Sequence, residues 1–426
     1  MKVLIVNTSE RTGGAAVAAS RLMNALRNNG IQATMLVRDK QTDEKSVIEL
    51  GNSLRKKTLF IWERFVIWIC NLFNTKNLFK VSIANTGFDI TEQPEFKEAD
   101  IIHLHWINQG MLSLDNIKKI LLSGKPVVWT MHDMWECTSI CHHAYTCDNF
   151  KKECKNCPFL RFPSGNDLAH RTFIKKSEIF RTAPFNVVTV SRWLAEQAKA
   201  STLLKDKRIT VIPNTLSLSE FKWLDREQCR ENLGLPKEKR ILIFGAARID
   251  DPIKGFDRVL ETIQYLIDHN HYTKEELHLV TFGTFKHPKE YANRIPVTYT
   301  NIGWVKKSST LSQLYSAADI AISASSYETF GQTLIEAQAC GCIPVSFGNS
   351  GQSDIIEHKK NGFLAEYLST ESLAEGIIWG LTEGAGIDRQ RMREDVFHRF
   401  SEQSVASQYI RLYEKSLSEP AVVEQD

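Results

Sequence analysis

The sequence predicts an α/β protein with two domains, each built around a parallel β-sheet. Its 426 residues are too many for one ordinary core and suit two domains. Short apolar runs alternate with helical patterns, and this alternation stops in a polar, charged stretch before it starts again. With 42% hydrophobic and 24% charged residues, the chain has the composition of a folded globular protein.

The first domain begins with a strand–helix–strand unit. The apolar run 3–6 predicts a strand, Gly13-Gly14 a turn, and residues 15–28 a helix that ends before Gly30. A second strand at 31–37 completes a βαβ unit, whose right-handed crossover implies a parallel sheet. Further strands are predicted at 101–104, 126–130, 186–190 and 209–212. Residues 1–212 therefore form an N-terminal Rossmann-like domain.

The second domain follows a polar stretch that we interpret as a linker over residues 213–240. Residues 241–400 form a second Rossmann-like domain, with strands at 241–246, 278–283, 320–325 and 343–347 and a helix at about 311–318. Residues 401–418 have helical spacing and are expected to form a terminal helix that packs back near the N-terminal domain. We expect residues 419–426 to be disordered.

The net charge of the chain bears on whether it binds nucleic acid, and its N-terminal residues bear on whether it is secreted. The 53 Lys and Arg against 50 Asp and Glu leave +3, so no strong field attracts nucleic acid, and a nucleic-acid-binding zinc protein fits poorly. The apolar run after Met1-Lys2 is too short for a signal-peptide core. We therefore expect a cytoplasmic protein with no nucleic-acid partner.

Five of the nine cysteines crowd into residues 137–158, an insertion in the first domain. The odd total fits a secreted disulfide framework poorly. Four thiolates at this spacing can surround a tetrahedral zinc ion, namely Cys141, Cys147, Cys154 and Cys157. A structural zinc site, reduced free thiols and a redox-labile disulfide all remain open.

Residues 59–73 are unusually apolar and aromatic, and helical spacing gathers the polar side chains of this region within about a third of the circumference. The broad face with Trp62, Phe65 and Trp68 must be covered by something. One interpretation buries it against the sheet; another makes residues 54–80 an interfacial contact with a membrane. A transmembrane span is least favoured because Glu63-Arg64 interrupts the run.

The stretch 327–342 carries two carboxylates, Glu328 and Glu336, with seven residues between them. If residues 329–332 form a loop that turns into a helix near Thr333, the N–H groups at the helix start face an anion. Glu336 inside that helix can then accept from paired hydroxyls such as a ribose diol. Arg248 and Lys254 follow a Rossmann-type strand and can supply positive charge to a diphosphate.

These motifs resemble those of the retaining glycosyltransferases of family four, over nearly the whole chain. The pair Glu328-x7-Glu336 matches the signature of that family, and residues 244–260 match its diphosphate-binding segment. The resemblance implies the GT-B fold, two facing Rossmann-like domains with an interdomain cleft. It also implies transfer of a sugar from a UDP- or GDP-linked donor to an acceptor hydroxyl with retention of configuration, without a cofactor.

The resemblance also implies roles for single residues. Glu328 would hold donor-sugar hydroxyls, and Arg248 and Lys254 the leaving diphosphate. The backbone of Phe330, Gly331 and Gln332 would bind the donor, and Glu336 its ribose.

Two further elements of the first domain take roles from the same resemblance. His132, after the strand that contains Trp129, would lie against the donor sugar at the reaction centre. Gly13-Gly14 would contact the donor phosphates. The sequence RTGGAA is not the dinucleotide fingerprint GxGxxG, which counts against a nicotinamide oxidoreductase.

The cysteine-rich insertion after the His-Asp-x-Trp element resembles that of exopolysaccharide glycosyltransferases of the colanic-acid type. It implies a glycan acceptor that is lipid-linked, in exopolysaccharide or lipopolysaccharide biosynthesis, and a peripheral position on the inner face of the cytoplasmic membrane. His103 and His105 either border the acceptor site or are structural. A GT-B-fold epimerase or phosphorylase and a non-catalytic scaffold are the alternatives.

Overall fold

The computed structural model describes residues 1–419, which divide into two compact units. The first unit comprises Met1–Thr215 together with the chain from Val405 onward, and the second comprises Leu216–Ser404. Each unit has its own sheet and its own hydrophobic core.

The first unit is built on a seven-stranded sheet in the order β3-β2-β1-β4-β5-β6-β7. Every neighbouring pair of strands is parallel, and Val3 of β1 pairs with both Ala33 of β2 and Ile101 of β4. The strand bounds are β1 Lys2–Ser9, β2 Gln32–Asp39, β3 Val47–Glu49, β4 Ile101–Leu104, β5 Val127–Met131, β6 Asn186–Thr189 and β7 Arg208–Val211. The buried apolar runs of β1, β4 and β5 are typical of a parallel sheet with both faces covered.

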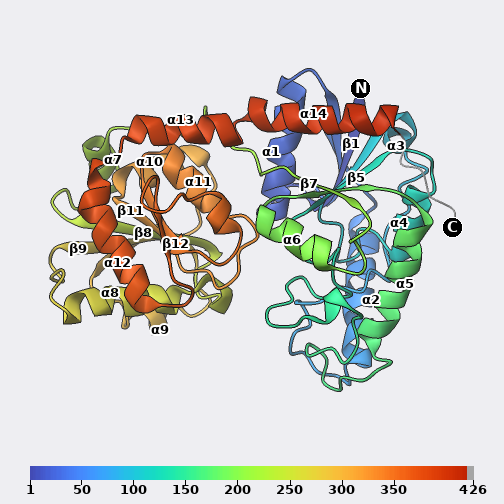
Figure 1. Cartoon of the computed structure of the whole chain (residues 1–426), viewed down its shortest axis with the longest axis horizontal. Coiled ribbons are helices and arrows are strands. Elements are labelled where there is room, and N and C mark those ends of the chain that lie inside the picture. Colours follow the sequence, from blue (N-terminus) through green and yellow to red (C-terminus); the bar gives the residue numbers. More distant parts are fainter. Residues whose placement is uncertain (420–426) are drawn as a thin grey trace. The chain divides into compact units, whose positions relative to one another are not determined.

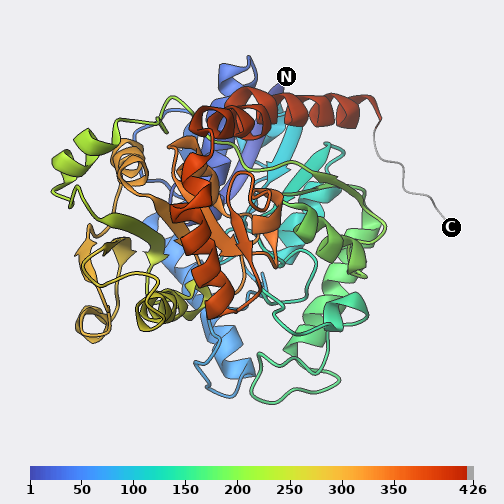
Figure 2. The same cartoon turned by 60° about the vertical axis from the view of Figure 1, so that its left-hand side comes forward.

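Helices cover the sheet of this unit, as Figure 1 shows. They are α1 Gly14–Asn28, α2 Ser53–Cys70, α3 Pro94–Glu98, α4 Leu114–Leu121, α5 Leu168–Thr182, α6 Arg192–Ala200 and α14 Glu402–Ser418, with a short 3-10 helix η1 at Asn149–Lys151. The terminal helix α14 belongs to this unit because Val405, Tyr409 and Tyr413 are buried in the same core as Val3 and Leu22. Figure 2 shows this helix in dark red near the N-terminus.

The second unit has a six-stranded parallel sheet in the order β10-β9-β8-β11-β12-β13. Its strands are β8 Arg240–Arg248, β9 Leu277–Thr284, β10 Thr298–Asn301, β11 Ile320–Ser323, β12 Ile343–Phe347 and β13 Phe363–Ala365. Its helices are α7 Arg226–Leu233, α8 Phe256–Asp268, α9 Pro288–Ala292, α10 Ser308–Ala317, α11 Gln332–Ala339, α12 Thr370–Leu381 and α13 Arg389–Phe400, with 3-10 helices η2 Pro252–Lys254, η3 Gly351–Asp354 and η4 Glu383–Gly386.

In both sheets the strand order reverses once, between β1 and β4 in the first and between β8 and β11 in the second. This is the order of the Rossmann fold, in which ligands bind at the carboxyl ends of the strands beside the reversal. The loops after these strands are therefore the places where binding residues are expected.

Most of the predicted linker, 213–240, is part of the second unit. From Leu216 it belongs to the second unit, and it contains helix α7. Arg230 of α7 is buried, donates to the carbonyl of Ala317 and pairs with Asp319 at 2.9 Å. The stretch looks like a linker in sequence because its packing depends on charged side chains. The C-terminal tail, 419–426, was expected to be disordered. Its first residue, Glu419, donates its N–H to the carbonyl of Lys415, and residues 420–426 lie outside the described residues.

Helix α2 contradicts the interpretation that its aromatic face is buried against the sheet. Its buried residues are Glu63, Arg64 and Ile67, whereas Trp62 and Phe65 are exposed. Within the described part of the chain, no helix is both long and apolar enough to cross a membrane.

Candidate active site

The loop after β8 brings Lys254 to the carboxyl end of the neighbouring strand β11. Gly255 follows Lys254 with φ of 73°, and a Cβ atom there would lie 2.1 Å from the carbonyl oxygen of Ala324, just after β11. Only glycine allows this approach. The Lys254 Nζ consequently lies 2.8 Å from Oε2 of Glu328, a residue far away in sequence.

The Lys254–Glu328 pair fixes the charge state of its lysine. The carboxylate of Glu328 raises the pKa of Lys254 above its usual value, so the amine stays protonated at neutral pH. Two hydrogen bonds fix the backbone of Glu328. Its N–H donates to the Ser350 hydroxyl, and its carbonyl accepts from the Gly351 N–H at 2.9 Å. The site therefore presents one fixed cation and one fixed carboxylate side by side.

Helix α11 begins next to this pair, directly after Phe330 and Gly331. Gly331 is its N-cap with φ of 107°, and no side chain caps the helix. The free N–H groups and the dipole at such a helix start favour an anion. Within the described residues, both amide atoms of Gln332 are buried without a hydrogen-bond partner. Glu336 lies about one turn further along the same helix and is buried.

Arg248 is at the end of β8, as predicted, but it is not free to act on a ligand in this state. Its guanidinium pairs with Asp251 at 3.1 Å and approaches Asp250 at 3.7 Å. The side chain is half exposed, and two carboxylates balance its charge. A bound phosphate would have to compete with these aspartates, which the sequence motif did not indicate.

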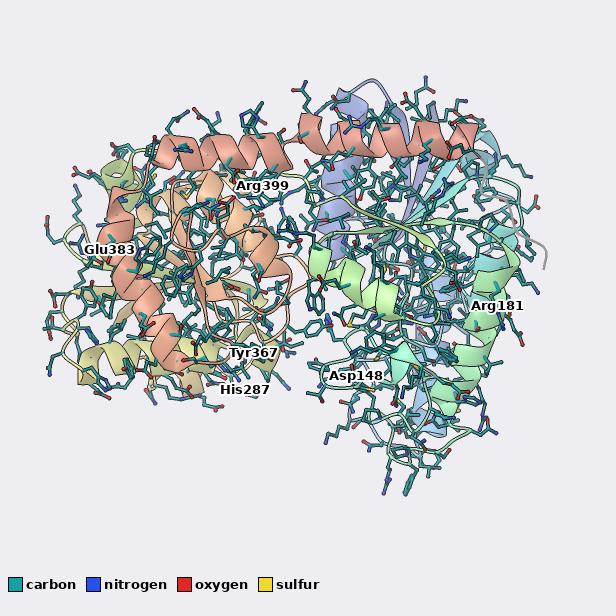
Figure 3. The ribbon with its side chains drawn as sticks, in the orientation of Figure 1. Asp148, Arg181, His287, Tyr367, Glu383 and Arg399 are labelled. Atoms are coloured by element: carbon teal, nitrogen blue, oxygen red, sulfur yellow. The ribbon has the colours of Figure 1, made fainter. Side chains whose placement is uncertain are left out.

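Three residues near the site were missed in the sequence. Tyr367, labelled in Figure 3, donates its hydroxyl to the carbonyl of Ser326 at 3.2 Å, and Asn349 donates to the same carbonyl at 3.2 Å. Ser350 accepts from the Glu328 N–H. All three follow β12 or β13, so their position at the carboxyl edge of the sheet was the only available signal.

In the first unit, His132 follows β5 and contacts His105, which follows β4. The His105 Nδ1 and His132 Nε2 atoms are 2.8 Å apart, and the two rings stack at 5.1 Å. Burial lowers the pKa of His132 to about 4, against an opposing effect of Asp133. His132 is therefore a neutral imidazole at physiological pH, able to donate or accept a hydrogen bond.

His103 and His105 have different surroundings. His103 is buried between Thr130, at 2.8 Å from its Nε2, and Tyr413 of α14, at 2.7 Å from its Nδ1. It therefore ties the terminal helix to the sheet. His105 contacts the predicted catalytic residue His132 directly.

Asp133, next to His132, anchors the start of the cysteine-rich insertion. Its carboxylate accepts from Trp106 Nε1 and from His142 Nδ1, each at 2.8 Å. Burial acts against ionisation, but His142 and the other donors hold the pKa of Asp133 below its usual value. The Nε2 of His142 lies 3.0 Å from the Ser82 hydroxyl, so both of its ring nitrogens have protein partners.

Gly13 ends the turn between β1 and α1, and Gly14 is the first residue of α1, so the helix begins one residue earlier than predicted. Gly13 is the N-cap of α1 with φ of 93°, and a Cβ on either glycine would meet no atom within 4 Å apart from the adjoining backbone. The turn leaves open space around its backbone, as close approach of a ligand requires. Nearby, the buried Glu10 accepts from the N–H groups of Gln41 and Thr42 and fixes the loop after β2.

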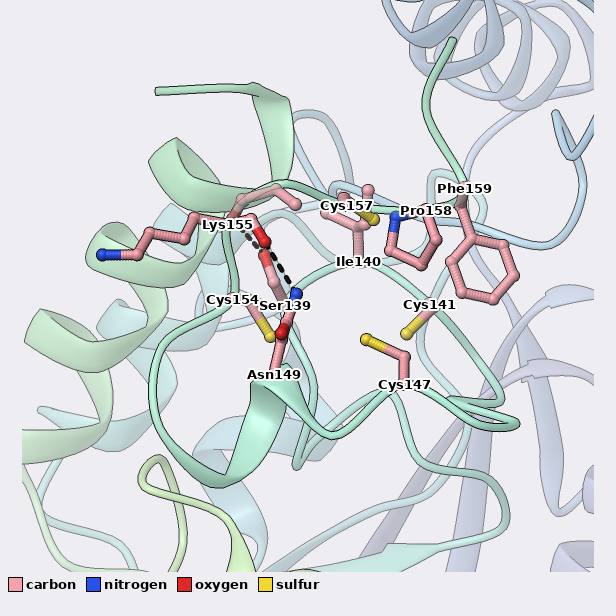
Figure 4. Close-up of a pocket in the computed structure, with 11 residues that line it drawn as sticks. Ser139, Ile140, Cys141, Cys147, Asn149, Cys154, Lys155, Cys157, Pro158 and Phe159 are labelled. Carbon is pink, nitrogen blue, oxygen red and sulfur yellow. Dashed lines mark hydrogen bonds between the residues drawn. The ribbon is translucent and has the colours of Figure 1, made fainter. Parts of the chain in front are cut away.

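The four cysteines of the predicted zinc set line one small cavity (Figure 4). Cys141 and Cys147 point their sulfur atoms toward one another, and all four are free thiols. Burial raises the pKa of Cys154 to about 11 and that of Cys157 to about 12, so these thiols stay protonated. Among residues 1–419 no three His, Cys, Asp or Glu side chains are arranged to hold a metal ion, and the zinc site stays a prediction.

Two family models match the chain and together span most of it. The model of glycosyltransferase family 4 matches residues 12–220, and that of the glycosyl transferases group 1 matches residues 225–399. The first corresponds to the unit with Gly13-Gly14 and His132, and the second to the unit with Lys254 and Glu328. The chain is thus a retaining glycosyltransferase of the hexosyltransferase type, with the GT-B fold, that uses a nucleotide-sugar donor.

Within this class the chain belongs with the group 1 and family 4 enzymes, and its similar proteins are distant. An uncharacterised glycosyltransferase of Methanocaldococcus jannaschii is 22% identical over 79% of this chain and 90% of its own. A glycosyl transferase of Escherichia coli assigned to colanic acid biosynthesis is 22% identical over 76% of this chain and 77% of its own. The structure of Anabaena HepE in complex with UDP and glucose has a TM-score of 0.63 at 15% identity, covering 97% of this chain and all of that one.

Proposed function

We propose that this glycosyltransferase moves a sugar from a UDP- or GDP-linked donor to a hydroxyl of a growing glycan acceptor. The observation that carries the proposal is the Lys254–Glu328 pair, which stands next to the uncapped start of α11. A cation and helix N–H groups suit a diphosphate, and a neighbouring carboxylate suits sugar hydroxyls.

The proposed mechanism assigns charge stabilisation to the protein. As the sugar departs, negative charge grows on the diphosphate, and Lys254 with the N–H groups of Phe330, Gly331 and Gln332 stabilises it. Arg248 joins them once phosphate oxygens replace its aspartate partners. The leaving phosphate accepts the acceptor proton on the same face, so neither a covalent nucleophile nor a metal ion is needed.

The other roles follow from the family resemblance. We assign Glu328 to the donor-sugar hydroxyls and Glu336 to the ribose. His132 and Gly13-Gly14, in the first unit, keep the proposed contacts with the donor sugar and phosphates. A neutral His132 can donate to a sugar oxygen without competing for the proton of the acceptor.

For the acceptor we propose a lipid-linked oligosaccharide in the synthesis of a surface polysaccharide. The similarity to the colanic acid enzyme of Escherichia coli and the cysteine-rich insertion support this choice. The exposed aromatic segment within residues 54–80 also supports it, because a protein that acts on lipid-linked substrates works at a membrane.

A donor screen tests the proposal before any acceptor is known. Purified protein is heated with a panel of UDP- and GDP-sugars, because a ligand that binds the folded state raises the melting temperature. We expect one nucleotide sugar to stabilise the protein and Glu336→Ala to abolish the shift. Glu290→Ala, at an exposed carboxylate of the same unit, is the control. If the protein converts a nucleotide sugar to its isomer when no acceptor is present, it is an epimerase. If no nucleotide sugar raises the melting temperature, a non-catalytic scaffold is favoured.

A further inference from the structure

Helix α2 carries its charged residues inward. The Glu63 carboxylate accepts from the backbone N–H groups of Ile83 and Ala84, each at 2.9 Å. Arg64 pairs with Glu63 at 3.0 Å and donates to the carbonyl of Val81 at 2.9 Å. These charge-assisted bonds fasten one side of the helix to the segment that follows it.

The opposite side of α2 is apolar and exposed, and its neighbours extend it. We call this surface the aromatic face; its exposed members are Leu54, Ile61, Trp62, Phe65, Ile69, Leu72, Phe73, Phe79 and Phe162. The rings form a row, since Trp62, Phe65 and Trp68 follow one another at about 6 Å and Trp68 meets Phe73 at 4.7 Å. In Figures 1 and 2 α2 runs beside the loops of the cysteine-rich insertion. Phe162 lies shortly after the insertion in sequence.

The helix cannot bury this face by rolling on its axis. Rolling would break the bonds of Glu63 and Arg64 and leave two charges buried without partners, which is costly. The aromatic face is therefore held outward by the structure. A contiguous apolar surface of this kind indicates a binding partner.

The charges around the face identify that partner. Exposed cations border it at Arg55, Lys57, Lys76, Lys80 and Arg161. From residue 50 to residue 88 the sequence has one acidic residue, Glu63, and it is buried. Aromatic side chains bordered by Lys and Arg, with no exposed carboxylate among residues 50–88, suit the headgroup level of a bilayer that contains anionic lipid.

We infer that the aromatic face docks the first unit on an anionic lipid bilayer, with the rings inserted to headgroup depth and the cations against lipid phosphates. A second copy of the chain is a poorer occupant, because a symmetric contact would bring two sets of like charges together. Bilayer docking itself does not depend on the donor chemistry; only the step that places it beside a lipid-linked acceptor rests on the proposed function.

Vesicle co-sedimentation of the full chain tests the inference. The probes are vesicles of phosphatidylcholine alone and of phosphatidylcholine with phosphatidylglycerol, at low and at moderate salt. We expect binding to the anionic vesicles only, weakened by salt. Trp62→Ser with Phe65→Ser should reduce binding at least tenfold. Trp304→Ser in the other unit is the matched control, because Trp304 is 57% exposed and Trp62 is 53% exposed.

A second pair of variants tests the charges separately. The double variant Lys57→Glu, Lys76→Glu should bind anionic vesicles more weakly, by about fivefold or more for each cation replaced. This factor corresponds to the binding free energy of about 1 kcal/mol that one Lys or Arg contributes near an anionic membrane surface. Both side chains are exposed, so folding should not change, and thermal unfolding checks this.

Three results would overturn the inference. They are no binding to anionic vesicles, equal binding to both kinds of vesicle, and a wild-type dimer in sedimentation analysis that the Trp62→Ser, Phe65→Ser variant converts to a monomer. Because the assay contains no nucleotide sugar, its failure leaves the transferase proposal intact. If the chain binds anionic vesicles but no nucleotide sugar, the transferase proposal is refuted and the docking inference stands.

Discussion

Separate substitutions at Lys254 and Glu328 should affect nucleotide binding differently. Lys254→Met removes the cation that we assign to the leaving diphosphate and keeps most of the side chain. Glu328→Gln removes a negative charge 2.8 Å from that cation and keeps the shape. If Lys254 acts on phosphate, the first change weakens nucleotide binding. The second leaves it equal or stronger, because a repelling carboxylate is gone.

The size of the Lys254 effect follows from Coulomb's law. A phosphate charge about 4 Å from Nζ gains about 4 kcal/mol at an effective dielectric constant of about 20. The Lys254 side chain is 35% exposed, so solvent screening reduces this value. We expect a loss of about 2–3 kcal/mol in transition-state stabilisation, or about 30- to 150-fold in kcat/KM.

Two assays measure this prediction. Titration calorimetry with UDP and GDP gives the binding constants, and release of nucleotide from the donor found in the screen gives turnover. Glu328→Gln should bind nucleotide but turn over far more slowly. Lys274→Met, at an exposed lysine of the same unit, is the control and should change neither quantity.

Two results would refute the reasoning. Full turnover by Lys254→Met would remove Lys254 from the diphosphate site. Equal loss of nucleotide binding in Lys254→Met and Glu328→Gln would mean that the pair only supports the local structure, because a structural pair loses the same contact whichever partner is changed.

The remaining predictions concern stability. His103 and His132 have pKa values lowered by burial to about 3 and about 4, below the unfolded value of about 6.5. The unfolded chain therefore binds more protons as pH falls from 6.5 toward 4. The free energy of unfolding should drop by up to about 1.4 kcal/mol per pH unit for each histidine. Urea unfolding at pH 7 and at pH 5 measures this drop. The same free energy of unfolding at both pH values would contradict the lowered pKa values. Gly255→Ala should lose more stability than Gly234→Ala, because both glycines have positive φ but only the Cβ at 255 would meet Ala324, and equal losses would contradict this contact.

Much of the fold could be predicted because parallel strands are continuous apolar runs. The run at 343–347 became β12 with the same bounds, and the run at 3–6 became the centre of β1, which continues through polar residues to Ser9. The place of Lys254 and Glu328 at strand ends could also be predicted. Their ion pair could not, since it depends on how closely Gly255 approaches the end of β11.

The orientation of α2 shows where sequence reasoning fails in physical terms. Helical spacing separated its polar and aromatic faces correctly, but a wheel does not show which face turns inward. That choice was made by the N–H groups of Ile83 and Ala84, which need the Glu63 carboxylate as acceptor. His142 is a similar case, because it adjoins Cys141 of the predicted zinc set in sequence, whereas Asp133 and Ser82 contact both of its ring nitrogens.

The arrangement around β8 and β11 explains why residues distant in sequence can form one site. The two strands are neighbours at the point where the strand order reverses, so the loops that follow them leave the same edge of the sheet. The last residue of β8 is Arg248 and the loop after it supplies Lys254, while the segment after β11 supplies Glu328 and the start of α11. In this state each cation is matched by a carboxylate, Lys254 by Glu328 and Arg248 by Asp251. A diphosphate that enters must replace some of these contacts with its own oxygens, so the cations are held in place before the ligand arrives and need little reorganisation when negative charge develops on it.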